Sequence, residues 1–395
     1  YSLVLKTSDA SLSLPKGISV EIMGVTHTKS ETFNSSRSDI GASDVHVKSL
    51  SGYTSSVSVS GRTITVTFGL KEVAKGTFIR LRNYNSNLYA TLSADGTALG
   101  MAPAGLNNII YLDKDGHLLF YQNGQYVKNT NQMAAVGELG STYTFTRGTD
   151  DFKECFDIKS NANKYLMGSS NGTSTGGSPS GSEYAYWYVE ELTELPVSVT
   201  TAGYGYATIY CPVALNISGG AAAYYVSRKE RKTGKTGVEY WLTLSPFKSS
   251  IPANTPAVIV GIPGTTYQFG LTDTYTEPSF TQAAGITGHV AASLTSSITG
   301  KVFTLQPNSQ EEKVGFYPWN NSVTSGFKAY FTSSNNEAAY YRLVFEDEDV
   351  TDIHVEVVED SVEMIYDLCG RPVGTSIESL SQGIYVKGGR KFIVK

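Results

Sequence analysis

Hydrophobic and polar residues alternate with a period of two along most of the chain. Between residues 57 and 68, valines alternate with serines up to a turn at 60–61, and Ile64, Val66 and Phe68 then alternate with threonines. A period of two gives a strand one apolar face, so this segment is predicted to form a hairpin. Elsewhere the apolar runs are of strand length, and none reaches the roughly 18 residues of a membrane-spanning helix. The pattern predicts an all-β fold without a membrane span.

One part of the chain is internally repeated. The segment 79–90 resembles 156–166, and the segment between them has the same strand–turn–strand form. Three tyrosines mark these segments: Tyr89, Tyr126 and Tyr165 are 37 and 39 residues apart. Repeats of about 40 residues are typical of a repeat architecture. The region resembles a β-trefoil of the ricin-B-like kind, although the QxW signature of that family is absent from all three repeats.

The changes of pattern predict a multidomain all-β protein. The sequence Leu195-Pro196 is expected to end the repeated region, because proline interrupts regular structure. The predicted parts are a small β-sandwich-like module at 1–73, a β-trefoil at 74–195, a β-sandwich at 196–345, an acidic linker at 346–361 and a C-terminal tail at 362–395. Because no leader sequence precedes Tyr1, the chain is interpreted as a mature fragment or as an expressed piece of a longer protein.

Charge is unevenly distributed along the chain. The net charge is −5, and residues 346–360 alone carry eight acidic side chains and no Lys or Arg, so the rest sums to +3. A solvated linker is favoured over a Ca²⁺ site there, because no EF-hand spacing is present. The weak net charge argues against a nucleic-acid partner. Three distant cysteines, Cys155, Cys211 and Cys369, favour buried free thiols over one disulfide.

The C-terminal tail carries the most specific motif. Ile365-Tyr366-Asp367-Leu368 is followed by Gly370-Arg371, and Gly383-Ile384-Tyr385-Val386 by Gly389-Arg390-Lys391. This pattern resembles the C-terminal sorting domain of the type IX (Por) secretion system. The resemblance implies two or three short strands, export by that secretion machinery, and a secreted or outer-surface location. The sorting signal would include Tyr366, Gly370, Arg371, Gly383, Tyr385 and Arg390. Residues 196–345 are similar to β-sandwich modules of surface proteins from Gram-negative anaerobes.

Apparent catalytic motifs do not fit their structural contexts. Residues 168–172 match GxSxG, but a Gly/Ser/Thr-rich loop follows where a nucleophile elbow needs a helix. The Gly-Lys-Thr sequence at 234–236 lacks the upstream glycine of a P-loop and is predicted to be a charged hairpin tip. The five histidines show no metal-ligand spacing. We therefore expect no catalytic residues, no metal and no cofactor.

Aromatic residues in turns are the better candidates for binding. Sugars present apolar C–H faces and hydroxyl edges, so their sites combine exposed rings with amide or carboxylate groups. Tyr84 beside Asn83, Tyr186 after a flexible loop, and Trp319 beside Asn320 fit this pattern. Alternation places Trp187 on the opposite face from Tyr186, in the core.

These observations favour a non-catalytic, secreted or cell-surface accessory region that binds host, dietary or microbial glycans. One alternative is a glycan-active hydrolase whose carboxylates come from distant strands. The other is a structural spacer for a catalytic domain outside this sequence.

Overall fold

The computed structural model divides the chain into two compact units. The first unit comprises Tyr1–Leu118, Lys128–Gln132 and Ser141–Glu191, and the second comprises Leu119–Val127, Met133–Gly140 and Leu192–Lys395. The structure describes all residues except 11, 51, 130, 177–181, 201–204, 235–236, 274, 276–278, 309–312, 335–337, 347–364, 369–370, 375–376, 378–379, 388–389 and 395. Within these, regular structure is strand apart from short 3₁₀ turns, which confirms the predicted all-β class. These turns include Ala42–Asp44, Leu106–Asn108, Asp150–Phe152, Glu183–Ala185 and Thr295–Ser297.

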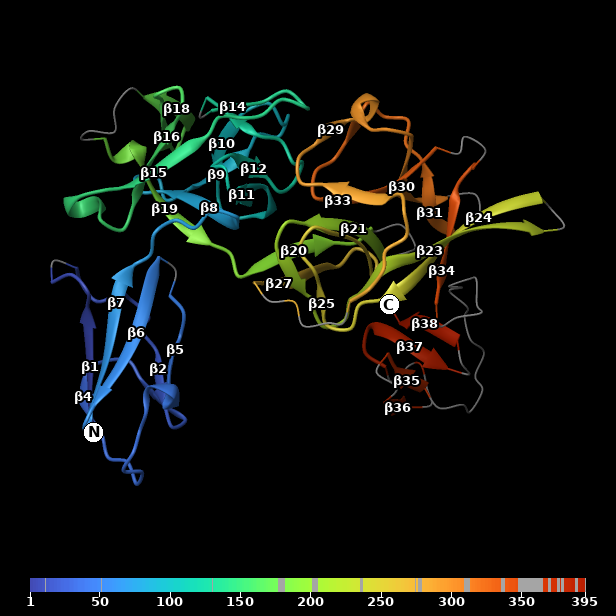
Figure 1. The fold of residues 1–395 in the computed structure, drawn as a ribbon. Helices are drawn as coiled ribbons and strands as arrows, with labels where there is room; N and C mark the ends of the chain where they lie inside the picture. Colours follow the sequence, from blue (N-terminus) through green and yellow to red (C-terminus); the bar gives the residue numbers. More distant parts are fainter. Residues whose placement is uncertain are drawn as a thin grey trace. The chain divides into compact units, whose positions relative to one another are not determined.

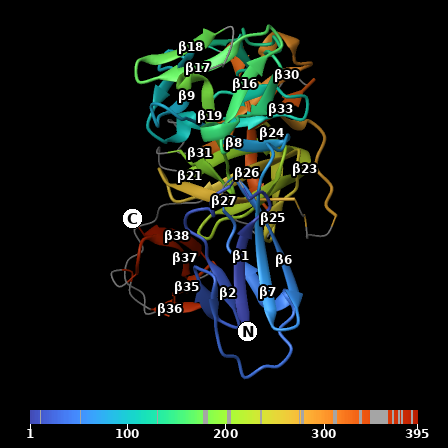
Figure 2. The same ribbon diagram turned by 90° about the vertical axis from the view of Figure 1, so that its left-hand side faces the viewer.

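Two small sheets around one core form the N-terminal module of the first unit. Its strands are β1 (Ser2–Thr7), β2 (Val20–Ile22), β3 (Val25–His27), β4 (Glu31–Thr32), β5 (Val45–Val47), β6 (Tyr53–Ser60) and β7 (Thr63–Leu70). One sheet has the order β4-β1-β7-β6, with β1 parallel to β7, and the other has the order β3-β2-β5 (Figures 1 and 2). Ile64, Val66 and Phe68 are buried between the sheets, so the predicted hairpin and its inward face are confirmed.

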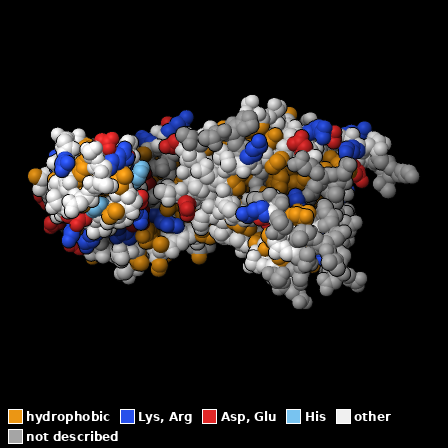
Figure 3. Space-filling view, turned by 90° about the horizontal axis from the view of Figure 1, so that it is seen from below, with side chains coloured by type: hydrophobic (Ala, Val, Ile, Leu, Met, Phe, Trp, Pro, Cys, Tyr) orange, Lys and Arg blue, Asp and Glu red, His pale blue; other side chains and the backbone are white. Residues whose placement is uncertain are grey.

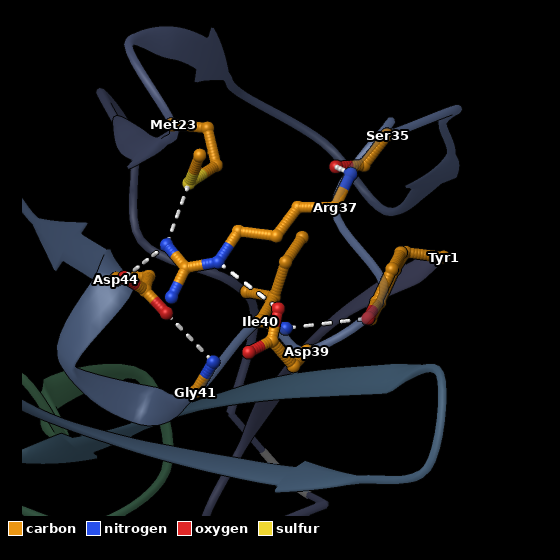
Figure 4. A network of polar contacts seen from close by, with 8 residues as sticks. All are labelled: Tyr1, Met23, Ser35, Arg37, Asp39, Ile40, Gly41 and Asp44. Carbon is orange, nitrogen blue, oxygen red and sulfur yellow. Dashed lines mark hydrogen bonds and ion pairs between the residues drawn. The ribbon is translucent and has the colours of Figure 1, made fainter.

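An arginine fixes the loop between β4 and β5. Arg37 donates from Nε to Asp39 Oδ1 and from Nη1 to Asp44 Oδ1, each at 3.1 Å (Figure 4). Asp44 Oδ2 accepts a hydrogen bond from the Gly41 N–H at 2.8 Å. The hydrogen bond to Asp39 and the charge of Asp44 raise the pKa of Arg37. Charge-assisted hydrogen bonds thus give the loop a defined path without regular secondary structure.

The repeated region consists of three repeats of four strands. The first contains β8 (Thr77–Asn83), β9 (Tyr89–Leu92), β10 (Leu99–Ala102) and β11 (Ile110–Leu112). The second contains β12 (Leu118–Phe120), β13 (Val127–Lys128), β14 (Gln132–Met133) and β15 (Tyr143–Arg147), and the third β16 (Phe156–Ser160), β17 (Tyr165–Ser169), β18 (Gly172–Gly176) and β19 (Tyr186–Glu191). The first and fourth strands of the repeats pair in one sheet, and a bridge between His117 and Thr142 brings β12 to β15. The resulting six-stranded barrel is nearly closed.

The three marker tyrosines occupy equivalent places in the repeats. Tyr89 pairs with β8, Tyr126 forms a bridge to β12, and Tyr165 pairs with β16. Each tyrosine therefore lies opposite the first strand of its own repeat, near the start of the second strand. The threefold repetition predicted from the sequence is a repetition of structure.

Trp187 is a central residue of this barrel. Its side chain is fully buried, and Nε1 donates to the Leu166 carbonyl at 2.9 Å, which satisfies the indole N–H. Gly168 lies against the ring, where an added Cβ would come 2.6 Å from Cη2. The GxSxG match therefore belongs to the β17–β18 hairpin, and its first glycine makes room for the tryptophan.

A large curled sheet dominates the second unit. The strands between residues 194 and 345, which form this sheet and its neighbours, are β20 (Glu194–Ser198), β21 (Gly205–Cys211), β22 (Ala214–Asn216), β23 (Ala222–Gly234), β24 (Gly237–Pro246), β25 (Ser250–Ile251), β26 (Thr255–Gly261), β27 (Thr266–Thr272), β28 (Ile286–His289), β29 (Ser293–Leu294), β30 (Lys301–Asn308), β31 (Lys313–Pro318), β32 (Val323–Thr324), β33 (Lys328–Ser333) and β34 (Tyr341–Phe345). Nine strands form one sheet in the order β21-β26-β23-β24-β34-β31-β30-β33-β28. The two ends of the sheet contact each other, because β21 and β26 lie against β28 and β33. Strands β23 and β24 form the long hairpin visible in Figure 1, as predicted for the charged segment.

Aromatic side chains fill the interior of the curled sheet. The core includes Tyr206, Tyr240, Phe303, Phe316, Phe331 and Tyr341. A second sheet, in the order β20-β27-β22-β25, packs on β26 through Tyr267, whose hydroxyl accepts a hydrogen bond from the Ile262 N–H at 2.7 Å. Gly261 admits this ring, since an added Cβ would lie 2.5 Å from it. The region is therefore layered, with one layer curled nearly into a barrel.

Pro196 lies inside a strand of the second unit. It belongs to β20 and pairs with Gln268 of β27, whereas β19, the last strand of the repeated region, ends at Glu191. Because β20 is an edge strand of its sheet, the missing proline N–H removes no hydrogen bond that the sheet requires. The expectation that the proline interrupts regular structure was therefore wrong.

The C-terminal tail forms a small sheet of its own. Its described strands are β35 (Ile365–Asp367), β36 (Pro372–Gly374), β37 (Gly383–Lys387) and β38 (Arg390–Val394), in the order β36-β35-β37-β38. Ile365, Tyr385 and Phe392 form its core. The described residues thus contain four strands, where the sequence predicted two or three. Except for Glu346, the predicted acidic linker 346–361 lies outside the described residues.

Replacing Gly168 by alanine should destabilise the first unit by about 1–3 kcal/mol, because the new methyl group would overlap the Trp187 ring. Gly100→Ala is the matched control, since its Cβ would meet the nearest atom, Thr91 Cγ2, at 3.5 Å. Chemical denaturation of both variants measures the difference. Equal stability of the two would show that the tryptophan does not require a glycine there.

Candidate functional site

A cleft opens where the two ends of the nine-stranded sheet approach each other. It has a volume of about 240 Å³ and lies between β21 on one side and β30 and β33 on the other. Trp319, directly after β31, lines it together with a series of hydroxyl side chains. These hydroxyl residues include Thr200, Thr208, Thr304, Thr324, Ser325 and Tyr330. An indole beside several hydroxyl groups suits a small, polar ligand with an apolar face.

The turn after β31 fixes the position of Trp319. Its backbone N–H donates to the Val302 carbonyl at 2.8 Å, and its indole Nε1 donates to the Val323 carbonyl at 2.8 Å. The residue is half-buried. Because both polar groups are already paired within the fold, the indole contributes a rigid apolar surface to the cleft and loses little conformational freedom on binding.

Lys328 is the charged residue of the cleft. It begins β33, and among the described residues that line the cleft it is the only one with a formal charge at neutral pH. Its side chain is exposed to solvent in the cleft, and desolvation by the neighbouring protein lowers the pKa of its ammonium group. It forms no ion pair or hydrogen bond with the described residues. The cleft therefore carries a positive charge without a compensating carboxylate in its described lining.

Tyr330 connects this cleft to a neighbouring hollow. It is 2% exposed, and its buried hydroxyl has no hydrogen-bond partner among the described residues. The hollow, of about 430 Å³, is lined by Tyr330 and His289, whose rings lie 5.3 Å apart. Burial raises the pKa of Tyr330 to about 12 and lowers the pKa of His289. A buried hydroxyl without a partner costs free energy, so this position lowers the stability of the fold.

The predicted trefoil candidates form an aromatic cluster in the first unit. Tyr186 stacks on Phe152 with ring centroids 4.0 Å apart and 8° between the planes, and Tyr84 meets Phe152 edge-on at 5.0 Å. Tyr188 stacks on Tyr84 at 6.0 Å and lies under Arg82 at 4.2 Å. Tyr84 and Tyr186 are half-buried. The fold thus brings these rings together, but each ring is partly covered by its neighbours, which leaves less ring surface for a ligand.

The two predicted asparagines have different surroundings. Asn83 is fully buried: its amide nitrogen donates to the Tyr184 carbonyl at 2.9 Å, and its oxygen accepts from the Ser86 N–H at 3.0 Å. The structure therefore uses this side chain to hold the turn, and a ligand at the surface does not reach it. Asn320 is exposed and follows Trp319, but it does not line the cleft.

The residues predicted to form a sorting signal belong to the C-terminal tail with its small sheet. Exposed Arg371 donates to Asp367 at 2.7 Å, and Tyr366 is 39% exposed. Tyr385 is buried and donates to the Ser381 carbonyl at 2.8 Å, with Gly383 against its ring. Arg390 begins β38. Gly370 lies outside the described residues.

One potential metal-ligand group was not predicted. Ligand atoms of Asp113, Asp115 and His117 lie within 4.8 Å of one another in the β11–β12 turn. Asp113 accepts hydrogen bonds from the N–H groups of Asp115 and His117, at 2.9 and 2.8 Å. These hydrogen bonds hold a tight turn in which Gly116 has φ +97°, so the three side chains lie together without a metal ion being required.

The two described cysteines are buried free thiols, as the sequence predicted. Cys155 and Cys211 are free and buried, and burial raises the pKa of each thiol to about 12. Cys369 lies outside the described residues. Thiols with such high pKa values are poor nucleophiles at neutral pH.

Sequence reasoning selected Trp319 but missed Lys328 and Tyr330. A lysine at the start of a strand and a tyrosine two residues later are ordinary in a β-rich chain. Their proximity to Trp319 depends on how distant strands meet. The available signal was the alternation Lys328, Tyr330, Thr332 on the face opposite Phe331, which faces the core.

No family model matches the chain, and no curated protein matches its sequence. Within the described part of the chain, no helix has the length and apolar character needed to cross a membrane. On the face drawn in Figure 3, acidic and basic side chains are interspersed. The functional argument therefore rests on the chemistry of the cleft and the cluster.

Removing the Tyr330 hydroxyl should stabilise the unliganded protein. The Tyr330→Phe variant loses a buried hydroxyl without a partner, so we expect its free energy of unfolding to rise by about 1 kcal/mol at pH 7. The wild type should also lose stability between pH 10 and pH 12 relative to this variant. The raised pKa keeps the folded tyrosine protonated while the unfolded one ionises.

Denaturant titrations from pH 7 to 12 give both results. Tyr184→Phe is the control, because Tyr184 is 46% exposed. A variant less stable than wild type, with no change in the alkaline limb, would contradict the burial of an unpaired hydroxyl.

Proposed function

We propose that this chain is a non-catalytic accessory region that binds glycans through the cleft at Trp319. The observation that carries the proposal is a rigid, half-buried indole in the wall of a small, hydroxyl-rich cleft. An indole face packs against the C–H face of a sugar ring, and surrounding hydroxyls donate to or accept from the sugar hydroxyls.

The size and chemistry of the cleft favour binding of a small unit. Its volume of about 240 Å³ is below the roughly 300–1,000 Å³ of pockets that enclose drug-sized ligands. One sugar ring suits this space better than a longer chain. Glycoside hydrolysis commonly uses a pair of carboxyl groups, whereas the polar groups that support this proposal are hydroxyls, an amide and an ammonium.

The aromatic cluster around Phe152 is a second candidate surface. Tyr84 and Tyr186 are half-buried there, and Asn85 donates to Glu183 at 2.9 Å beside them. Because the rings already stack on one another, we propose this cluster as a weaker contact than the cleft.

We also propose that the protein is exported to the cell surface or the medium through its C-terminal tail. The proposal rests on the sequence pattern around Tyr366, Arg371, Gly383, Tyr385 and Arg390 and on the separate four-stranded sheet that contains it. An independently paired sheet at the chain end can be recognised without unfolding the remaining modules.

Trp319→Ala should reduce glycan binding at least tenfold, because truncation removes the apolar wall of the cleft. Trp241→Ala is the matched control. Trp241 is also half-buried and donates its Nε1 within the fold, to Glu239 at 2.9 Å, but it does not line the cleft. A glycan array followed by calorimetric titration measures both variants, with thermal unfolding as the check on folding.

The outcomes separate the alternatives. If Trp319→Ala and Trp241→Ala lose equal glycan affinity, the loss results from reduced stability, and the cleft is not the binding site. Release of reducing sugar during incubation would support the hydrolase alternative. If the wild type binds no glycan, the remaining interpretation is that the chain is a structural spacer for a catalytic domain outside this sequence.

Arg371→Ala should block export while leaving the protein folded, because an exposed ion pair with Asp367 contributes little stability. Fractionation of a type IX-secreting host would find the variant in the periplasm and the wild type outside the cell. Arg228→Ala, on the β23 hairpin, is a control arginine that is also exposed. Normal export of Arg371→Ala would contradict the assigned role.

A further inference from the structure

The charge of the cleft restricts the kind of sugar that it would bind. Lys328 is the only formally charged residue at neutral pH in the described lining, and no described residue pairs with it. Its side chain is exposed in the cleft, so its ammonium group is accessible to a ligand, and no carboxylate of the described lining compensates its charge. An accessible, unpaired ammonium can form a charge-assisted hydrogen bond with an anionic group of a ligand.

Three groups of different chemistry meet at this cleft. Trp319 supplies an apolar face, Lys328 an ammonium, and Tyr330 a buried hydroxyl without a described hydrogen-bond partner. Lys328 and Tyr330 are two residues apart on β33 and therefore lie on the same face of the strand. Trp319 reaches the cleft from the turn that follows β31.

We propose that the cleft binds a sugar that carries one anionic group, a carboxylate or a sulfate, with its anion at Lys328 and its ring against Trp319. This inference rests on the proposed glycan binding and adds the ligand class. The anion compensates the ammonium, and the apolar face of the sugar ring packs on the indole.

Electrostatics explains why a neutral sugar is the poorer ligand. A neutral hydroxyl accepts a hydrogen bond from the ammonium but leaves its charge uncompensated, whereas a carboxylate or sulfate forms a charge-assisted hydrogen bond. The protein walls beside the pair lower the effective dielectric constant below that of bulk water, which strengthens the attraction. The cleft is open to solvent, so added salt should weaken binding of the anion.

The test compares three ligands that differ at one carbon: methyl galactoside, methyl galacturonide and methyl galactoside 6-sulfate. Each is titrated calorimetrically into the complete chain of 395 residues. At least one anionic ligand should bind tenfold or more tightly than the neutral one, and the preference should shrink in 0.5 M salt. The carboxylate and sulfate arms distinguish the two sources of negative charge.

Lys328→Met keeps the length of the side chain and removes its charge. We expect the variant to lose at least tenfold in affinity for the anionic ligand, which corresponds to about 1.4 kcal/mol. Its affinity for methyl galactoside should remain. Lys328→Arg should retain a preference for the anion, and Lys248→Met, at an exposed lysine outside the cleft, should behave as wild type.

Failure of this inference can be told from failure of the proposed function. Equal affinity for neutral and anionic ligands, with loss of both in Trp319→Ala, would overturn the anionic preference and keep glycan binding. An anionic preference that survives in Lys328→Met would also overturn it. Should none of the three ligands bind and the wild type recognise no glycan on an array, both proposals would fall.

Discussion

In the second unit, the two ends of a nine-stranded sheet meet without completing a continuous ladder. The Tyr210 N–H of β21 donates to the Phe327 carbonyl at 3.0 Å, and the Tyr210 side chain packs where Gly288 of β28 leaves room. An added Cβ on Gly288 would lie 2.5 Å from Tyr210 Cβ. A sheet of this size exposes unpaired backbone groups at its edges unless it curls or is covered. Its closure through packing, with few hydrogen bonds, defines where the cleft can form.

This closure also explains the composition of the cleft. Phe331 points into the aromatic core, so its neighbours Tyr330 and Thr332 on β33 must point to the other face. Lys328 lies on that same face at the beginning of the strand. The packing that fills the interior with aromatic rings therefore sets the positions of an ammonium and a hydroxyl outside it. A binding site placed on strands has the rigidity that preorganised recognition requires.

The sheet of the repeated region closes in a different way from the nine-stranded sheet. Each of its three repeats contributes two strands to a nearly closed barrel and a hairpin beside it, so no long sheet has to curl. Trp187 is fully buried, and Gly168 packs against its ring because it has no side chain. The aromatic cluster around Phe152 stands on this scaffold, which leaves its rings half-buried and Asn83 fully engaged in a turn.

The sequence by itself determined the local features of the protein. Alternation of period two predicted the hairpin at 57–68 with its turn at Gly61, and recurring tyrosines predicted three equivalent repeats. These features depend on backbone geometry within a few residues, or on similarity between segments. The effect of Pro196 was misjudged, because a proline is compatible with a strand that lies at the edge of its sheet.

Only the tertiary structure decided which side chains meet. Trp319 follows β31, Lys328 begins β33 and Thr208 lies on β21, more than a hundred residues earlier, yet all line one cleft. Their proximity results from the register of distant strands and the curl of the sheet, which no local pattern encodes. Contacts between distant segments also explain why Asn83 is buried, because its side chain donates a hydrogen bond to a carbonyl 101 residues away along the chain.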